Sequence, residues 1–156
     1  MKIRDAEPSD VESMVRLSEI FRKSLSTFSP ILWRMAEGSF ESQAAFFRRL
    51  LSFEDTIAIV AERDSELEGF VIGRLQEAPP VYDPGGPVLL IDDFCVASEA
   101  EWPTVAPQLL EAVEQRARSQ GAVLSVVICP RRGAAKRRFL DEQGFDVTSE
   151  WHIRAL

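Results

Sequence analysis

The sequence holds few of the residues that build metal sites and disulfide frameworks. Its 156 residues include one histidine, His152, and two cysteines, Cys95 and Cys129. A zinc site usually takes about four ligands, so these three separated residues predict no metal site. Both cysteines lie in apolar, strand-like runs without CxxC spacing. We therefore predict buried free thiols in a reducing cytoplasm rather than a disulfide.

Long apolar runs are also missing. The longest, near Val88–Ile91 and Ala122–Cys129, fall far short of the roughly 20 residues that span a bilayer. The opening segment, MKIRDAEPSD, has no apolar core and no small-residue cleavage site, so it is not a signal peptide. The sequence thus predicts a cytoplasmic protein with no membrane partner.

Basic residues are the minority among the charges. Eighteen lysines and arginines against 25 aspartates and glutamates leave a net charge of −7. This balance argues against nucleic acid as the main partner, although it allows a local anionic ligand. Hydrophobic residues make up 46% of the chain, which is enough apolar surface to exclude disorder. At this length we expect a single domain, residues 1–156, with its own core.

Hydrophobic periodicity predicts alternating strands and helices. The expected strands are Lys2–Ala6, Thr56–Glu62, Leu67–Leu75, Val88–Val96, Ala122–Cys129 and a final one around Asp146–Arg154. The expected helices are one that opens at Pro8 and carries an apolar stripe to Phe21, and three at Ser42–Leu51, Thr104–Gln120 and Ala134–Gln143. Because Ala122–Cys129 is almost continuously apolar, we expect a central strand covered on both faces. The order β-α-α-β-β-β-α-β-α-β indicates an α/β (α+β) fold with a mixed sheet flanked by helices.

Three segments carry a family resemblance. They are the hairpin IAIVAERDSELEGFVIGRL, the strand and helix IDDFCVASEAEWPTVAPQLLEAVEQRARSQGA, and the helix end AAKRRFLDEQGF. In order and spacing they resemble the GNAT superfamily, the Gcn5-related N-acetyltransferases, over most of Asp5–Phe145. The resemblance implies a GNAT-like sheet whose fourth and fifth strands splay apart. With a right-handed crossover through Thr104–Gln120, we predict that Val88–Val96 and Val123–Cys129 run parallel and diverge at their C-terminal ends.

The resemblance also implies a function. GNAT proteins hold acetyl-CoA between the splayed strands, and an amine substrate enters from the other side. The expected activity is therefore direct transfer of an acetyl group from acetyl-CoA to an amine of a small molecule or peptide. The alternative is a catalytically silent GNAT-fold protein that binds a ligand, CoA or a protein partner. A homodimer is left open.

The cofactor loop departs from the family pattern. In the family, a loop Arg/Gln-Gly-x-Gly-x-Gly/Ala exposes backbone N–H groups that receive the pyrophosphate. The resemblance places it on Glu101–Ala106, where Ala106 alone keeps the pattern and two prolines offer no N–H. The residues that the resemblance assigns to the cofactor are Phe94, Cys95, Val96, Trp102, Pro103, Thr104, Val105, Ala106, Pro107, Arg132, Gly133 and Lys136. Trp102 either plugs the pyrophosphate groove or packs under the helix while the N–H groups of Thr104 and Val105 face the ligand.

The proton-transfer groups depart as well. The family's tyrosine acid is Leu140 here, and the asparagine seven residues before it is Gly133. Asp92, at the position of a base proposed in polyamine-type members, is the candidate base, because a half-buried carboxylate can have a raised pKa; the alternative is an ion pair at the splay. Tyr82, the one tyrosine, is the candidate acid or a residue that closes the substrate cleft; the more general explanation is packing of its amphipathic ring.

A basic segment follows the last strand of the cleft. Five of the 18 basic residues fall within eight positions, namely Arg131, Arg132, Lys136, Arg137 and Arg138. One interpretation is a solvated helix face. The other is that Arg132 and Lys136 hold the 3′-phosphate or pyrophosphate of CoA in place of the lost loop arginine.

Overall fold

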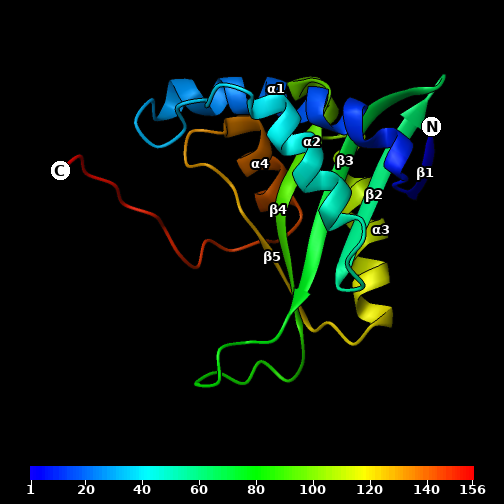
Figure 1. Ribbon diagram of the computed structural model, residues 1–156. Coiled ribbons are helices and arrows are strands. Elements are labelled where there is room, and N and C mark those ends of the chain that lie inside the picture. The colour runs from blue at the N-terminus through cyan, green and yellow to red at the C-terminus, as the bar shows by residue number, and fades with distance from the viewer.

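Helices cover both faces of one mixed sheet in the computed structural model, which describes residues 1–156 (Figure 1). The five strands follow each other in the sheet in chain order: β1 (Lys2–Asp5), β2 (Thr56–Arg63), β3 (Glu66–Gln76), β4 (Val88–Val96) and β5 (Leu124–Val127). The helices are α1 (Val11–Phe28), α2 (Ser39–Leu50), α3 (Ala106–Ser119) and α4 (Ala134–Glu142), with single 3-10 turns at Pro8–Asp10 and Glu99–Glu101. None of these helices is both long and apolar enough to cross a membrane.

The two sheet faces have separate hydrophobic cores. On one face, α1 and α2 pack on β2, β3 and β4 through residues such as Phe47, Phe70 and Cys95. On the other face, α3 and α4 pack on the same strands through residues such as Phe94, Trp102 and Phe139. Successive strand residues point to opposite faces, so neighbours such as Phe94 and Cys95 on β4 enter different cores.

Strand β4 changes its neighbours at the two aspartates. On one side, β3 pairs with it along its length, but Ile72 faces Asp93 while Gly73 faces Ile91. Asp92 is therefore the extra residue of a β-bulge. On the other side, β5 runs parallel to β4 only as far as Ile91, where the Ile128 N–H donates to the Ile91 carbonyl at 2.9 Å. The predicted parallel pairing and divergence of these strands are confirmed.

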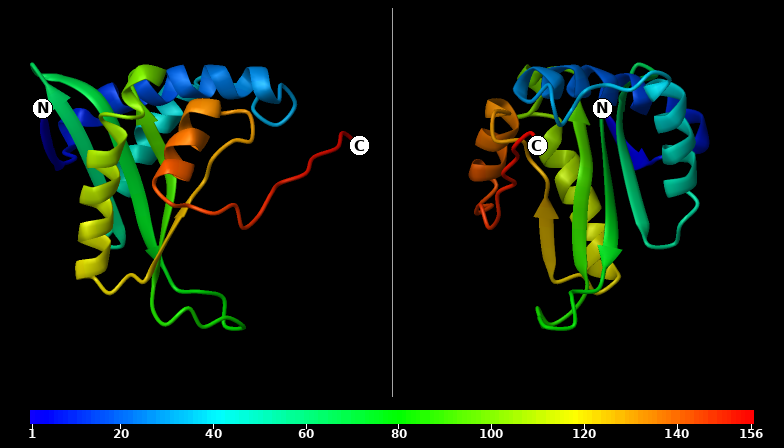
Figure 2. Two further views of the ribbon diagram at one scale, coloured as in Figure 1. Left: turned by 180° about the vertical axis from the view of Figure 1, so that it is seen from behind. Right: turned by 60° about the vertical axis from the view of Figure 1, so that its left-hand side comes forward.

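Two expectations about the C-terminal part were wrong. β5 is the edge of the sheet rather than a central strand, and Leu124 and Val126 are 52% and 42% exposed. The chain after α4 forms no strand: it runs away from the body of the molecule as an extended tail (Figure 2). Both errors have one physical cause. A segment with a strand pattern forms a strand only where a neighbouring strand accepts its hydrogen bonds. The tail does not pair with β5, so the tail forms no strand and β5 remains at the edge of the sheet.

Candidate active site

The two aspartates at the divergence of β4 and β5 lie in different environments. Asp92 is exposed, whereas Asp93 is half-buried. Burial raises the pKa of Asp93 to about 6, and the charge of Asp92 adds to the rise. Lys136 on α4 and Arg22 on α1 oppose this rise through their positive charges. The structure thus raises the pKa of Asp93, the residue next to Asp92, which the sequence suggested as the base.

Lys136 lies inside the protein beside this carboxylate. Its exposed fraction is 2%, and its Nζ donates to the backbone carbonyl of Phe94 at 3.4 Å. The rings of Phe21, Phe94 and Trp102 surround the amine, with centroids 5.5, 5.5 and 5.8 Å from Nζ. Desolvation lowers the pKa of Lys136. The expectation that Lys136 lies on an exposed basic face was wrong, because its side chain points into the core beneath α4.

Trp102 fills the space between β4 and α4. It is 6% exposed and packs edge-on against Phe94, with ring centroids 5.2 Å apart. Its other neighbour is Phe139 of α4, at 5.5 Å, and Phe94 and Phe139 also meet edge-on at 5.8 Å. These three rings join the diverged half of β4 to α4. Trp102 is therefore a core residue at the start of α3.

Two N–H groups of the loop before α3 form hydrogen bonds within the loop. Those of Thr104 and Val105 both donate to the Glu101 carbonyl, at 3.1 and 2.8 Å. The Glu101 carboxylate accepts the Ser98 N–H at 2.9 Å in a capping box. Pro103 has no N–H to offer. The alternative in which the N–H groups of Thr104 and Val105 face a ligand therefore does not agree with the structure, and these two groups do not form the pyrophosphate cradle of the family pattern.

The remaining residues assigned to the cofactor are mostly structural in character. Phe94, Cys95, Val105 and Ala106 are buried, and burial raises the pKa of the Cys95 thiol to about 12. Val96 pairs with Gly69 of β3. Pro103 is exposed in the loop before α3, Pro107 is half-buried in the first turn of α3, and Gly133 is the N-cap of α4.

Arg132 lines the larger cleft together with the aspartates, whereas Tyr82 does not. Arg132 is exposed, and its guanidinium donates to the Phe28 carbonyl at the end of α1 at 3.1 Å. Arg132 and Lys136 therefore do not share a surface. Tyr82 is 71% exposed in the loop between β3 and β4, which projects beyond the far end of the sheet (Figure 1). The structure does not bring Tyr82 together with Asp93.

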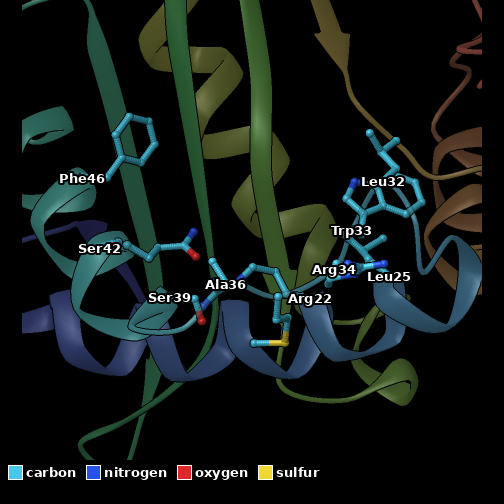
Figure 3. A pocket seen from close by; sticks show the side chains of 11 residues that line it. Arg22, Leu25, Leu32, Trp33, Arg34, Ala36, Ser39, Ser42 and Phe46 are labelled. Carbon is cyan, nitrogen blue, oxygen red and sulfur yellow. The ribbon is translucent and has the colours of Figure 1, made fainter. Parts of the chain in front are cut away.

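A cavity of about 420 Å³ opens between α1, the 29–38 loop and α2. Figure 3 shows Ser42 and Phe46 of α2 on one side and Trp33 and Arg34 of the loop on the other. Arg22 lines this cavity and also the larger cleft that contains Asp92 and Asp93. Sequence reasoning missed this cavity. The signal that could have found it is an arginine at position 22, among the apolar residues of the α1 stripe.

Comparisons with known proteins agree with this architecture. The family model described as "Acetyltransferase (GNAT) family" matches residues 18–145. A mutant BH1408 protein from Bacillus halodurans is 16% identical, with a TM-score of 0.88 over 100% of this chain and 99% of that one. A predicted acetyltransferase from Clostridium acetobutylicum, solved with acetyl-CoA, is 17% identical, with a TM-score of 0.74 over 99% of this chain and 95% of that one.

An aminoglycoside N-acetyltransferase, AAC(6')-Iy, solved with CoA, is similar in fold. It is 16% identical to this chain, with a TM-score of 0.74 over 99% of this chain and 93% of the neighbour. Likeness at this level of identity shows the fold alone. No curated protein matches the sequence. The family match covers most of the chain, and the divergence of β4 from β5 agrees with it, so this chain belongs to the GNAT acetyltransferase family.

Proposed function

We propose that the chain is an N-acetyltransferase that moves an acetyl group from acetyl-CoA to an amine of a small molecule or peptide. The observation that carries the proposal is Asp93, a half-buried carboxylate with a pKa raised to about 6, at the point where β4 loses its neighbour β5. Family membership supports the reaction class. We place the activity in the cytoplasm, since both cysteines are free thiols.

Asp93 has the properties of a base for an ammonium substrate. An alkylammonium must lose a proton before its nitrogen can act as a nucleophile. A carboxylate with a pKa of about 6 holds that proton roughly 100-fold better than one near 4, because each pKa unit is a factor of ten. Arg22 and Lys136 stabilise the charged form of Asp93. Asp93 is thus ionised at neutral pH and ready to accept the proton.

The part of the site that would bind acetyl-CoA supports the proposal less well than Asp93 does. Acetyl-CoA would supply the activated acetyl thioester. Beyond Ile91, the backbone of β4 is not paired with β5, which leaves polar groups for a ligand on that edge. In the loop of Glu101–Ala106, the N–H groups of Thr104 and Val105 are already bonded to the Glu101 carbonyl, Pro103 has none, and Glu101 adds an acid. We therefore expect weaker acetyl-CoA binding than in relatives with the glycine loop.

The second candidate function is a ligand-binding protein without acetyl transfer. The observation that favours it is the filled space between β4 and α4, where Lys136 already bonds the Phe94 carbonyl and Trp102 packs on Phe94 and Phe139. In this case the chain would keep the GNAT fold and the cavity beside α1 while the cofactor groove stays closed.

Thermal unfolding with acetyl-CoA and with CoA separates the two functions. Binding to the folded state raises Tm, so the enzyme is expected to show a concentration-dependent rise, and the silent protein none. A thiol-release assay with a panel of amines then measures transfer. Asp93→Asn should abolish transfer while leaving the acetyl-CoA shift unchanged. If Asp92→Asn abolishes it instead, Asp92 is the base; full activity in both variants contradicts a carboxylate base.

A further inference from the structure

The cavity beside α1 is positively charged in a negatively charged protein. Its lining includes two arginines, Arg22 and Arg34, and no aspartate or glutamate. The rest of the wall is apolar or neutral: Trp33 and Phe46 offer aromatic surface, and Ser42 is one of its hydroxyl groups. The chain as a whole carries a charge of −7. A cavity with this lining favours a ligand with an anionic group and an apolar body.

Arg22 has hydrogen bonds that the protein itself does not make. Its Nε and Nη2 atoms are shielded from solvent and have no partner. These two nitrogens form one edge of the guanidinium, and their parallel N–H groups match the two oxygens of a carboxylate. A buried polar group without a partner is unfavourable. A carboxylate in the cavity would satisfy both donors once this edge turns toward it.

A purely structural role leaves these donors unexplained. Arg22 lies near enough to Asp93 to oppose the rise of its pKa. However, Arg22 forms no ion pair with Asp93 or with any other carboxylate within 4.0 Å. Arg4, Arg63 and Arg74 each form such a pair. Arg22 is therefore a cation held at the wall between the cavity and the cleft of Asp93, with one edge unused.

We propose that the acceptor carries a carboxylate and that Arg22 binds it. The amine would then lie toward Asp93, because Arg22 lines both the cavity and the cleft that contains Asp93. This arrangement selects compounds in which an amine, a carboxylate and an apolar side group lie close together, as in an apolar amino acid or the terminal residue of a short peptide. Acetylation of the amine rests on the proposed function, but binding of the carboxylate by Arg22 does not depend on it.

Binding of phenylalanine and of phenethylamine, its decarboxylated analogue, tests the proposal by calorimetry on the full chain. Phenylalanine should bind about tenfold more tightly or better, since charge-assisted hydrogen bonds are strong. Arg22→Met should remove this difference, and Arg22→Lys, which keeps the charge without the fork, should restore only part of it. Arg16→Met is the matched control, because Arg16 lies on the exposed side of α1, and it should bind like the parent.

The outcomes separate this inference from the proposed function. Equal affinity for both compounds, or an unchanged preference in Arg22→Met, would overturn the carboxylate site. Preferential binding of phenylalanine without any acetylation would keep the site and overturn the enzyme. Acetylation of phenethylamine as efficiently as phenylalanine would keep the enzyme and overturn the site. Thermal unfolding of Arg22→Met checks the fold, and we expect no loss of Tm because a buried, unpartnered cation is removed.

Discussion

The ammonium of Lys136 donates to the backbone carbonyl of Phe94 at 3.4 Å, one residue beyond the aspartate pair on β4. This carbonyl belongs to the half of β4 that β5 no longer accompanies. A side chain from α4 thus satisfies a backbone group that the sheet leaves free. The contact joins α4 to the diverged half of β4, and three aromatic rings surround the ammonium and shield it from water.

Lys136→Met should fold and should be at least as stable as the parent at pH 7. Burial lowers the pKa of Lys136 below its ordinary value near 10.5, so the unfolded chain binds the proton more tightly than the folded one. The parent therefore gains stability as pH rises toward 10.5, and the variant lacks this gain. Urea unfolding of both proteins between pH 7 and 10 measures the difference. A stability difference that does not change with pH contradicts a lowered pKa.

Asp93→Asn should raise the free energy of unfolding at pH 7.5 by about 1–3 kcal/mol, since one pKa unit corresponds to roughly 1.4 kcal/mol. The folded-state pKa of Asp93 is raised to about 6, so between pH 4 and 6 the folded chain binds more protons than the unfolded one. The parent loses stability as pH rises through this window. The advantage of the variant should therefore shrink toward pH 4. Asp92→Asn, at the exposed carboxyl, is the control and should change stability little.

Trp102→Ala should lower the free energy of unfolding by about 3–5 kcal/mol, the usual cost of truncating a buried aromatic residue. It removes the ring that Phe94 and Phe139 both contact. Trp102→Phe, which keeps an aromatic ring there, should lose less. Val81→Ala, at a residue 78% exposed, should be nearly neutral. Denaturant unfolding measures all three, and a neutral Trp102→Ala would show that Trp102 is not part of the core.

Cys95 should resist thiol reagents in the folded protein. Its pKa is raised to about 12 by burial, so almost no thiolate forms at pH 8, and the thiolate is the reactive form. The half-buried Cys129 also has a raised pKa. In a Cys129→Ser background, the rate of modification should equal the rate of unfolding. Rapid modification of the folded protein would contradict the burial of Cys95, and denatured protein provides the full signal.

Local patterns in the sequence predicted most of the elements. The strand Val88–Val96 was predicted with its bounds. The hairpin connection after β2 was also placed correctly: Asp64 and Ser65 take the left-handed conformations of a tight turn, with φ of 51° and 67°. The family resemblance added the divergence of β4 and β5. The tail was mispredicted because its alternation shows only that it can form a strand, and pairing requires a partner that local sequence does not name.

The site depended on information that no local pattern carries. In the sequence, Lys136 is one of five basic residues within eight positions, and its spacing to Phe139 and Leu140 was the one hint that it shares their buried face. The choice between Asp92 and Asp93 depends on the bulge opposite Ile72 and Gly73, which shifts the register of two strands. Arg22 gains its importance only when the 29–38 loop and α2 close a cavity around it.

The sequence by itself determined the family and the order of strands and helices as far as α4, because these follow from hydrophobic period, turn residues and spacing along the chain. The tertiary structure alone decided which charges are buried and which polar groups lack partners. A side chain's pKa and its unmade hydrogen bonds depend on groups brought near it from distant segments. Asp93, Arg22 and Lys136 come from three elements, and only their packing around the diverged end of β4 makes them one site.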